Sequence, residues 1–274
     1  MGMKRAVILF VVMCVLCLVQ SAPCGGPAPG HTYVLLVQGI SRDPADRREK
    51  EQALHALRGF WLARAGVDPR RLVMLQTSAA SSKAQDTEPT AHNLRRALEA
   101  FASRIQPQDR FNCHYLGQAN AVGGALRLNL PGPDITDTEL ADWLRGIPAN
   151  RQFIVLDCPC AGLAARTLTA EGRILVCAAT AKQAYATRFT SALVQVLGRP
   201  ATDLDGDGKL SLLEAFTATA REIEAYYRRQ QILPTETPSL EDNGDGVASE
   251  QPWRYQTEPG DGAGAAAFVL AEGH

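Results

Sequence analysis

Residues 153–178 read FIVLDCPCAGLAARTLTAEGRILVCA, with two fully apolar runs, Phe153 to Leu156 and Ile174 to Ala178, on either side of a helix expected to begin near Gly162. Short apolar runs bounded by turn residues are typical of strands that are buried on both faces. Strands joined through a helix lie parallel in the sheet, because the helix returns the chain to the end of the sheet where the first strand began. The stretch therefore predicts a parallel α/β sheet.

The same alternation extends toward the amino terminus. Three further strands are expected, at Tyr33–Gln38, Leu72–Leu75 and Arg110–Leu116, and a short hairpin element at 125–130. Leucines at helical spacing predict helices over 49–64 and 90–103, and the capping box Thr136 to Glu139 opens another that runs to Arg145. The sequence predicts a single three-layer α/β domain over residues 31–200, with a mostly parallel sheet.

Composition excludes several classes of function. The 274 residues are 46% apolar and 21% charged, as in ordinary globular proteins, and the formal net charge is -1. No run of Lys and Arg is present, so nucleic acid is not an expected partner. Function must be inferred from local motifs.

The amino terminus has the pattern of a secretory signal. Met1 to Arg5 carries two positive charges, and Ala6 to Val19 is an unbroken apolar run, shorter than the ~20 residues of a membrane-spanning helix. We expect residues 1–24 to be a signal peptide, cleaved between 21 and 30, and no transmembrane helix in the mature chain. The protein is then secreted or periplasmic, where nearby thiols commonly pair. The pairing of Cys24, Cys113, Cys158, Cys160 and Cys177 is left open.

Short sequence motifs stand at the carboxyl ends of two predicted strands. Tyr115-Leu116-Gly117-Gln118-Ala119 closes one, and Asp157-Cys158-Pro159-Cys160-Ala161-Gly162 follows the other. Between Tyr33 and Leu197 the order of elements resembles the caspase-like cysteine peptidases, most closely secreted bacterial legumain-like proteins. Those families end the two strands with Y-x-G-H-G, whose His is the base, and [DE]-[AS]-C-x-S-G, whose Cys is the nucleophile. The resemblance implies a caspase/legumain-like fold.

Carried over position by position, the resemblance argues against catalysis. Gln118 stands at the position of the His and Pro159 at that of the nucleophile. An amide is not a base, and proline has no amide hydrogen to stabilise an oxyanion. We expect an inactive pseudopeptidase that acts by binding or scaffolding an unknown protein or peptide. The resemblance places the ligand pocket at Gly117, Gln118, Asp157 and Cys158, although Asp157 could instead cap the helix near Gly162.

Two alternatives stay open. In the first, the protein is an active, calcium-dependent peptidase that uses Cys160 as its nucleophile, because Cys160 keeps a C-x-G spacing. The nearest histidine on a strand, His114, is however roughly 13 Å short of Gln118. Cys158 and Cys160 are better explained as buried small residues or disulfide partners of Cys113 or Cys177. The other alternative is a calcium-stabilised envelope module unrelated to peptidases.

A second motif is independent of this resemblance. Residues 203–214, DLDGDGKLSLLE, match the twelve-residue EF-hand calcium loop, with Gly208 at the turn and Leu210 as the apolar anchor. Four carboxylates that converge on one point repel each other strongly unless a cation lies between them. We therefore expect Ca²⁺ as cofactor, with ligands from Asp203, Asp205, Asp207, Lys209 through its carbonyl, Ser211 and Glu214.

The segments around this loop are less informative. Residues 201–233 form the loop and a long exit helix, whereas the incoming helix stops at Gly198 and Pro200 interrupts the approach. A lone loop of this kind favours weak, structural calcium binding. Residues 234–274 form an acidic, Gly-rich segment whose apolar end could add an edge strand. Its second candidate loop, 241–246, is degenerate because Pro252 stands at the closing position, and oligomeric state is undetermined.

Overall fold

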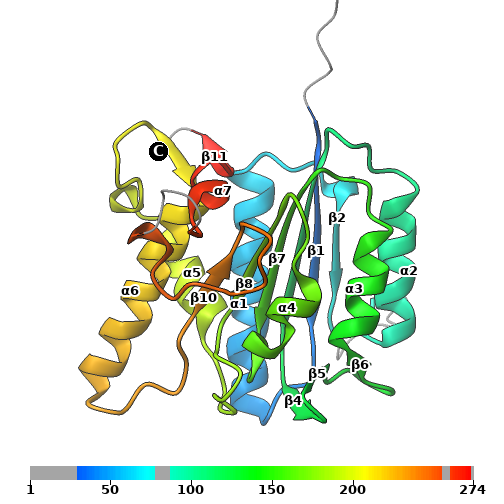
Figure 1. The fold of residues 1–274 in the computed structure, drawn as a ribbon, viewed down its shortest axis with the longest axis horizontal. Helices are drawn as coiled ribbons and strands as arrows, with labels where there is room; N and C mark the ends of the chain where they lie inside the picture. Colours follow the sequence, from blue (N-terminus) through cyan, green and yellow to red (C-terminus); the bar gives the residue numbers. More distant parts are fainter. Residues whose placement is uncertain (1–29, 78–86, 255–259, 273–274) are drawn as a thin grey trace, which may run out of the picture.

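The computed structural model describes residues 30–77, 87–254 and 260–272, so the signal-peptide prediction lies outside the described residues. A six-stranded sheet forms the centre of the molecule, in the order β10-β8-β7-β3-β1-β2 (Figure 1). Five strands are parallel: β1 (Thr32–Gln38), β2 (Leu72–Leu75), β3 (Arg110–Leu116), β7 (Arg151–Asp157) and β8 (Arg173–Cys177). The α/β class and the mostly parallel sheet predicted from the sequence are confirmed.

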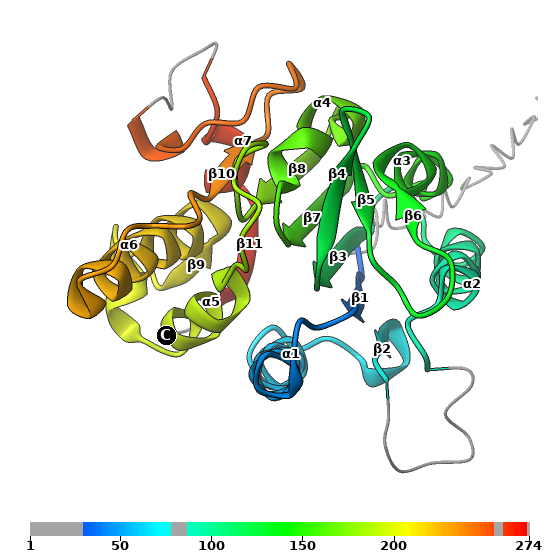
Figure 2. The same ribbon diagram turned by 90° about the horizontal axis from the view of Figure 1, so that it is seen from below.

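Both faces of the sheet are covered by helices (Figure 2). One face packs against α2 (Ala91–Ala102), α3 (Asp137–Arg145) and the short α4 (Ala165–Leu168), and the other against α1 (Pro44–Ala63), α5 (Phe189–Leu197) and α6 (Leu212–Gln230). Successive side chains of β1 point to opposite faces of the sheet, so Leu35 lies in the first apolar core and Val34 and Leu36 lie in the second. This double burial explains why the strands are apolar runs instead of alternating patterns.

Local signals position most of the helices. The Thr136 hydroxyl and the Glu139 carboxylate form the predicted capping box at the start of α3, and the Thr90 side chain caps α2. Helix α1 begins at Pro44, five residues before the expected start, because the Asp43 carboxylate accepts hydrogen bonds from the first amides and Pro44 suits the first turn. The helix expected near Gly162 is short: a 3₁₀ turn, η3 (Ala161–Ala164), leads into α4.

Smaller elements surround the sheet. A three-stranded sheet of β4 (Ala119–Val122), β5 (Ala125–Leu128) and β6 (Ile135–Thr136) follows β3 and contains the expected hairpin. The 3₁₀ turns η1 (Pro69–Arg71), η4 (Pro200–Thr202) and η5 (Pro252–Arg254) and the one-turn helix α7 (Ala263–Ala266) lie in the connections. Among the helices of the described residues, none is long and apolar enough to cross a membrane.

The carboxyl-terminal segment contributes more than the sequence suggested. Strand β10 (Ser239–Glu241) pairs antiparallel with β8 and becomes the edge strand of the central sheet. Strand β11 (Val269–Glu272), where the tail was expected to add an edge strand, instead pairs with β9 (Lys209–Ser211) in a separate two-stranded sheet. The carboxyl-terminal segment is therefore integral to the fold.

Replacement of Leu240 by Ala tests this integration. Leu240 is fully buried on β10, so the change should lower the free energy of unfolding by about 2–5 kcal/mol, as expected for a cavity in a packed core. Val247→Ala, at an exposed position on the same segment, should change it by less than about 0.5 kcal/mol. Urea denaturation measures both, and equal effects would show that β10 is only loosely attached.

Candidate functional site

The carboxyl ends of β3 and β7 lie together, as parallel pairing requires. The amide of Gly117 donates to the carbonyl of Asp157 at 3.1 Å, which places Gly117 and Gln118 beside the residues that follow β7. The backbone of Gln118 is held on both sides: its amide donates to the carbonyl of Ile40, and its carbonyl accepts from the Tyr115 hydroxyl at 2.7 Å. Its side-chain Nε2 is buried and has no hydrogen-bond partner in the described part of the chain.

Cys160 sits in a constrained position after Pro159. Its backbone is left-handed, with φ 56°, and its amide donates to the carbonyl of Gln183 at 2.8 Å. That amide is therefore occupied, and Pro159 has none, so neither residue offers an oxyanion donor. The Cys160 side chain is buried, and burial raises the pKa of its thiol.

His114 is enclosed in the core on the α5 face of the sheet. Its Nε2 lies 2.7 Å from Oγ1 of Thr190, and that hydroxyl donates to Oδ2 of Asp157 at 2.5 Å. Since the hydroxyl proton is directed at Asp157, His114 must carry its own proton on Nε2 and act as the donor. Burial lowers the pKa of His114 to about 3, so it is a neutral structural group and a poor base.

Asp157 corrects one expectation. It does not cap the helix near Gly162; its Oδ2 accepts from the amide and hydroxyl of Thr190, at the start of α5. Asp157 is fully buried, and its Oδ1 has no partner within the described residues. The Asp157 carboxylate anchors α5 to the end of β7.

The sequence did not indicate a second buried carboxyl group nearby, Glu236. Its oxygens accept from the Tyr227 hydroxyl at 3.1 Å and the Arg188 amide at 2.9 Å. Burial, and then the negative charge of Asp157, raise the pKa of Glu236 to about 8. No local pattern marks this residue, because the loop before β10 is folded against α6 only in the tertiary structure.

The four described cysteines are free and buried: Cys113, Cys158, Cys160 and Cys177. Burial raises the pKa of Cys113 and of Cys177 to about 12, and raises that of Cys158 well above its ordinary value. Disulfide pairing among these four is therefore not present, and their role as small core residues agrees with the structure. A thiolate nucleophile at neutral pH is disfavoured at every one of them.

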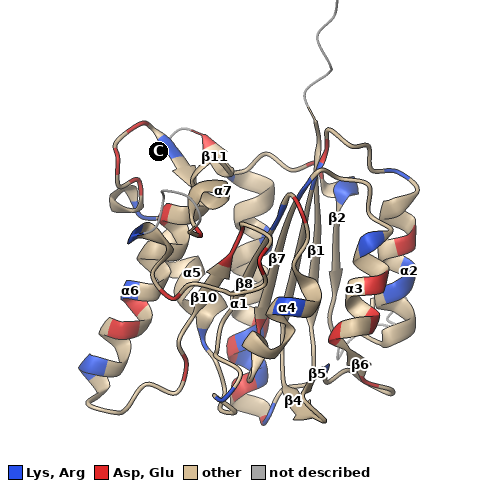
Figure 3. Cartoon of the chain, viewed as in Figure 1, with Lys and Arg blue, Asp and Glu red and all other residues tan. Residues whose placement is uncertain are grey.

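The acidic loop 203–214 follows η4, contains β9 and ends in the first turn of α6, and red segments mark its carboxylates (Figure 3). Carboxylate oxygens of Asp203, Asp205 and Glu214 lie within 4.8 Å of one another. Two ligands at about 2.4 Å from one calcium ion can be at most about 4.8 Å apart, so this spacing fits a shared cation. The structure thus brings together three of the predicted ligands.

Hydrogen bonds from backbone amides to the carboxylates fix the conformation of the loop. Asp203 accepts from the amides of Gly206 and Gly208, at 2.7 and 3.0 Å, and Asp207 accepts from that of Lys209 at 2.8 Å. Gly206 and Gly208 have φ of 74° and 79°, a region that favours glycine. The predicted turn at Gly208 is present, and Leu210 is fully buried as the apolar anchor.

Glu214 closes the loop from the first turn of α6. One carboxylate oxygen accepts from the Leu204 amide at 2.7 Å, and the other from the Ser211 amide at 2.8 Å. With Ser211, Glu214 also forms the capping box that opens α6. The Glu214 side chain therefore connects the second and ninth residues of the loop to the start of α6.

Residues 241–249 repeat this backbone pattern. Glu241 accepts from the amides of Gly244 and Gly246, as Asp203 does from Gly206 and Gly208, and Gly244 and Gly246 have φ of 87° and 76°. By sequence alone this loop is degenerate, because Pro252 occupies the closing position. In the structure, Asp261 takes that place: its oxygens accept from the amides of Asp242 at 3.1 Å and Ser249 at 3.0 Å.

Asp261 was missed because it lies outside any twelve-residue window. Like Glu214, it bonds to the second and ninth residues of its loop, but it comes from the segment before α7. Burial, then the negative charges of Asp242, Glu241 and Asp245, raise the pKa of Asp261 to about 6. The four carboxyl groups are therefore close enough to interact electrostatically.

No protein-family model matches this chain, and no curated protein matches it either.

Brief treatment with iodoacetamide near neutral pH tests the state of the thiols. The four described cysteines should stay unlabelled in the native protein, because each is buried with a raised pKa, and should react after denaturation. Mass spectrometry with peptide mapping reads the result. Rapid labelling at Cys160 alone, absent from Cys160→Ala, would contradict an inert site.

Glu236 should make stability depend on pH. Its pKa rises from an ordinary 4.5 to about 8 on folding, so the folded state binds more protons between these values and stability falls as pH rises through that window. Glu236→Gln should flatten this dependence, whereas Glu224→Gln, at an exposed position on α6, should leave it unchanged. Denaturation series at several pH values compare the two, and an unaltered slope in Glu236→Gln would count against the assignment.

Proposed function

We propose that this is a secreted calcium-binding protein with a caspase/legumain-like fold, whose peptidase site is inactive and which acts by binding or scaffolding another protein or peptide. Calcium binding is supported by one observation in loop 203–214: carboxylate oxygens of Asp203, Asp205 and Glu214 lie within 4.8 Å of one another. The signal-like amino-terminal sequence supports secretion.

The donor set suits calcium. Carboxylate oxygens predominate, and the Lys209 carbonyl and Ser211 hydroxyl stand at the seventh and ninth positions, where a calcium loop supplies its remaining oxygens. A hard cation that accepts six to eight oxygens at flexible geometry matches this set better than a cation with few, soft ligands. When bound, the ion would neutralise the loop's negative charge.

Inactivity is supported by three features of the strand ends. Gln118 cannot accept a proton from a thiol, the Cys160 amide is already bonded to Gln183, and His114 is a buried proton donor to Thr190. A cysteine peptidase needs a thiolate, a base and free oxyanion donors at one place. None of these requirements is met around Cys160 by the described residues, which favours the binding role over the alternative of an active enzyme.

Isothermal titration with calcium tests the proposal. The wild-type chain should bind with a Kd on the order of 10⁻⁴ to 10⁻³ M, as in extracellular modules, and Glu214→Gln should weaken binding at least about tenfold, because it removes the bidentate closing ligand. The matched control Glu224→Gln alters a carboxylate of α6 that faces solvent and should bind as the wild type does.

Absence of calcium binding in the wild-type chain, or equal binding by Glu214→Gln, would refute the calcium assignment. Stoichiometry carries additional information about the loop 241–249. If two ions bind and Asp261→Asn reduces the number to one, the second lies in that loop; one ion per chain confines binding to 203–214.

A further inference from the structure

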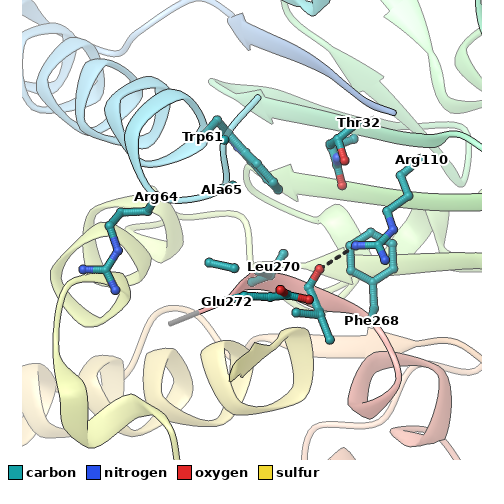
Figure 4. A pocket seen from close by; sticks show the side chains of 12 residues that line it. Thr32, Trp61, Arg64, Ala65, Arg110, Phe268, Leu270 and Glu272 are labelled. Carbon is teal, nitrogen blue, oxygen red and sulfur yellow. Dashed lines mark hydrogen bonds between the residues drawn. The ribbon is translucent and has the colours of Figure 1, made fainter. Parts of the chain in front are cut away.

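A cavity of about 340 Å³ lies where the parallel strands β1 and β3 begin. It is therefore at the opposite end of the sheet from Gln118 and Cys160, which follow the carboxyl ends of the strands. It is bounded by the end of α1, the first residues of β1 and β3, and β11, which comes from the carboxyl-terminal segment (Figure 4). Its volume falls within the ~300–1,000 Å³ of small-molecule pockets. It belongs neither to the calcium loop nor to the inactive peptidase site.

Apolar side chains form part of the cavity wall. Trp61 of α1 and Phe268, which precedes β11, both line the cavity, together with Leu270. All three side chains are at least nine-tenths buried, so they are fixed by the core and need little ordering when a ligand binds. Because so little of each side chain is exposed, the three residues bound the cavity but offer a ligand no broad apolar face.

Arg110 gives the cavity its charge. Its Nη1 donates to the Val269 carbonyl at 2.8 Å, and its guanidinium carbon lies 5.4 Å from the centre of the Phe268 ring, as Figure 4 illustrates. Arg110 makes no ion pair with any described residue. Its remaining N–H donors are therefore available to an anion.

A second cation reinforces this charge. Arg110 pairs in register with Arg151 on β7, so two guanidinium groups stand on adjacent strands at one edge. Burial, and then the positive charge of Arg151, lower the pKa of Arg110, whereas the negative charge of Glu272 acts in the opposite direction. Arg64 also lines the cavity, whereas Glu272 at its exposed rim is the one carboxylate among the lining residues.

We propose that this cavity binds a small organic carboxylate. The carboxylate lies against the Arg110 guanidinium, whose fork geometry matches two carboxylate oxygens, and the rest of the ligand occupies the cavity between the end of α1 and β11. Glu272 opposes the ligand's charge and limits the affinity.

Two probes of nearly the same shape test the proposal without any mutation. Calorimetric titration should show that 2-naphthoate binds at least about tenfold more tightly than the uncharged 2-naphthamide, because only the acid gains a charge-assisted hydrogen bond. Equal affinity for the two probes, or binding of neither, would overturn the proposal. The measurement needs no calcium site, so it is independent of the function proposed above.

Variants then locate the site. Arg110→Gln should abolish the preference for naphthoate, while Arg95→Gln, which removes an exposed arginine on α2, should preserve it. Since Arg110 also holds Val269, Glu272→Gln provides a variant at an exposed position that should fold normally; it should bind naphthoate several-fold more tightly, because a like charge is removed. Unchanged naphthoate affinity in both Arg110→Gln and Glu272→Gln would exclude this cavity.

Discussion

Mutual repulsion of the carboxylates in loop 203–214 is the constraint on which the carboxyl-terminal third of the molecule depends. Asp203, Asp205 and Glu214 are held together only because backbone amides and, in our proposal, a cation offset their charge. The loop sets the start of α6 through the capping box and the position of β9, and β9 in turn pairs with β11. Loop 241–249, closed by Asp261, follows β10 in a similar way, so two acidic loops join this segment to the central sheet.

At the other end of the sheet, the polar groups interact with one another. His114, Thr190 and Asp157 form a chain of hydrogen bonds in the core that attaches α5 to β3 and β7. A peptidase would need such groups directed at a substrate, with a thiolate among them. At the ends of β3 and β7, these polar side chains thus serve packing within the parallel sheet. A fold of this class supports binding as readily as catalysis, since function depends on the site and not on the architecture.

Features encoded by short-range patterns could be predicted from the sequence. The parallel strands, the capping box at Thr136 and the acidic loop each depend on residues within one element or one turn. Strand β10 and the pairing of β11 with β9 could not, because three- and four-residue strands show no period and pair with partners far along the chain. Asp261 and Arg110 likewise acquire their roles through tertiary contacts, with Ser249 and Val269. His114 lies with Leu116 on the second core face, where its ring is bonded to Thr190 of α5.

Terbium luminescence tests the central claim, cation binding in loop 203–214, most directly. Terbium replaces calcium in oxygen-rich sites and emits when a nearby tryptophan is excited, and Trp253 lines the same cavity as Asp205 and Glu214. We expect saturable emission that calcium displaces, that Glu214→Gln removes and that Trp253→Phe strongly reduces, while Trp143→Phe, on α3 outside this cavity, leaves it intact. Emission no greater than that of free terbium, or emission unaffected by Glu214→Gln, would contradict the claim.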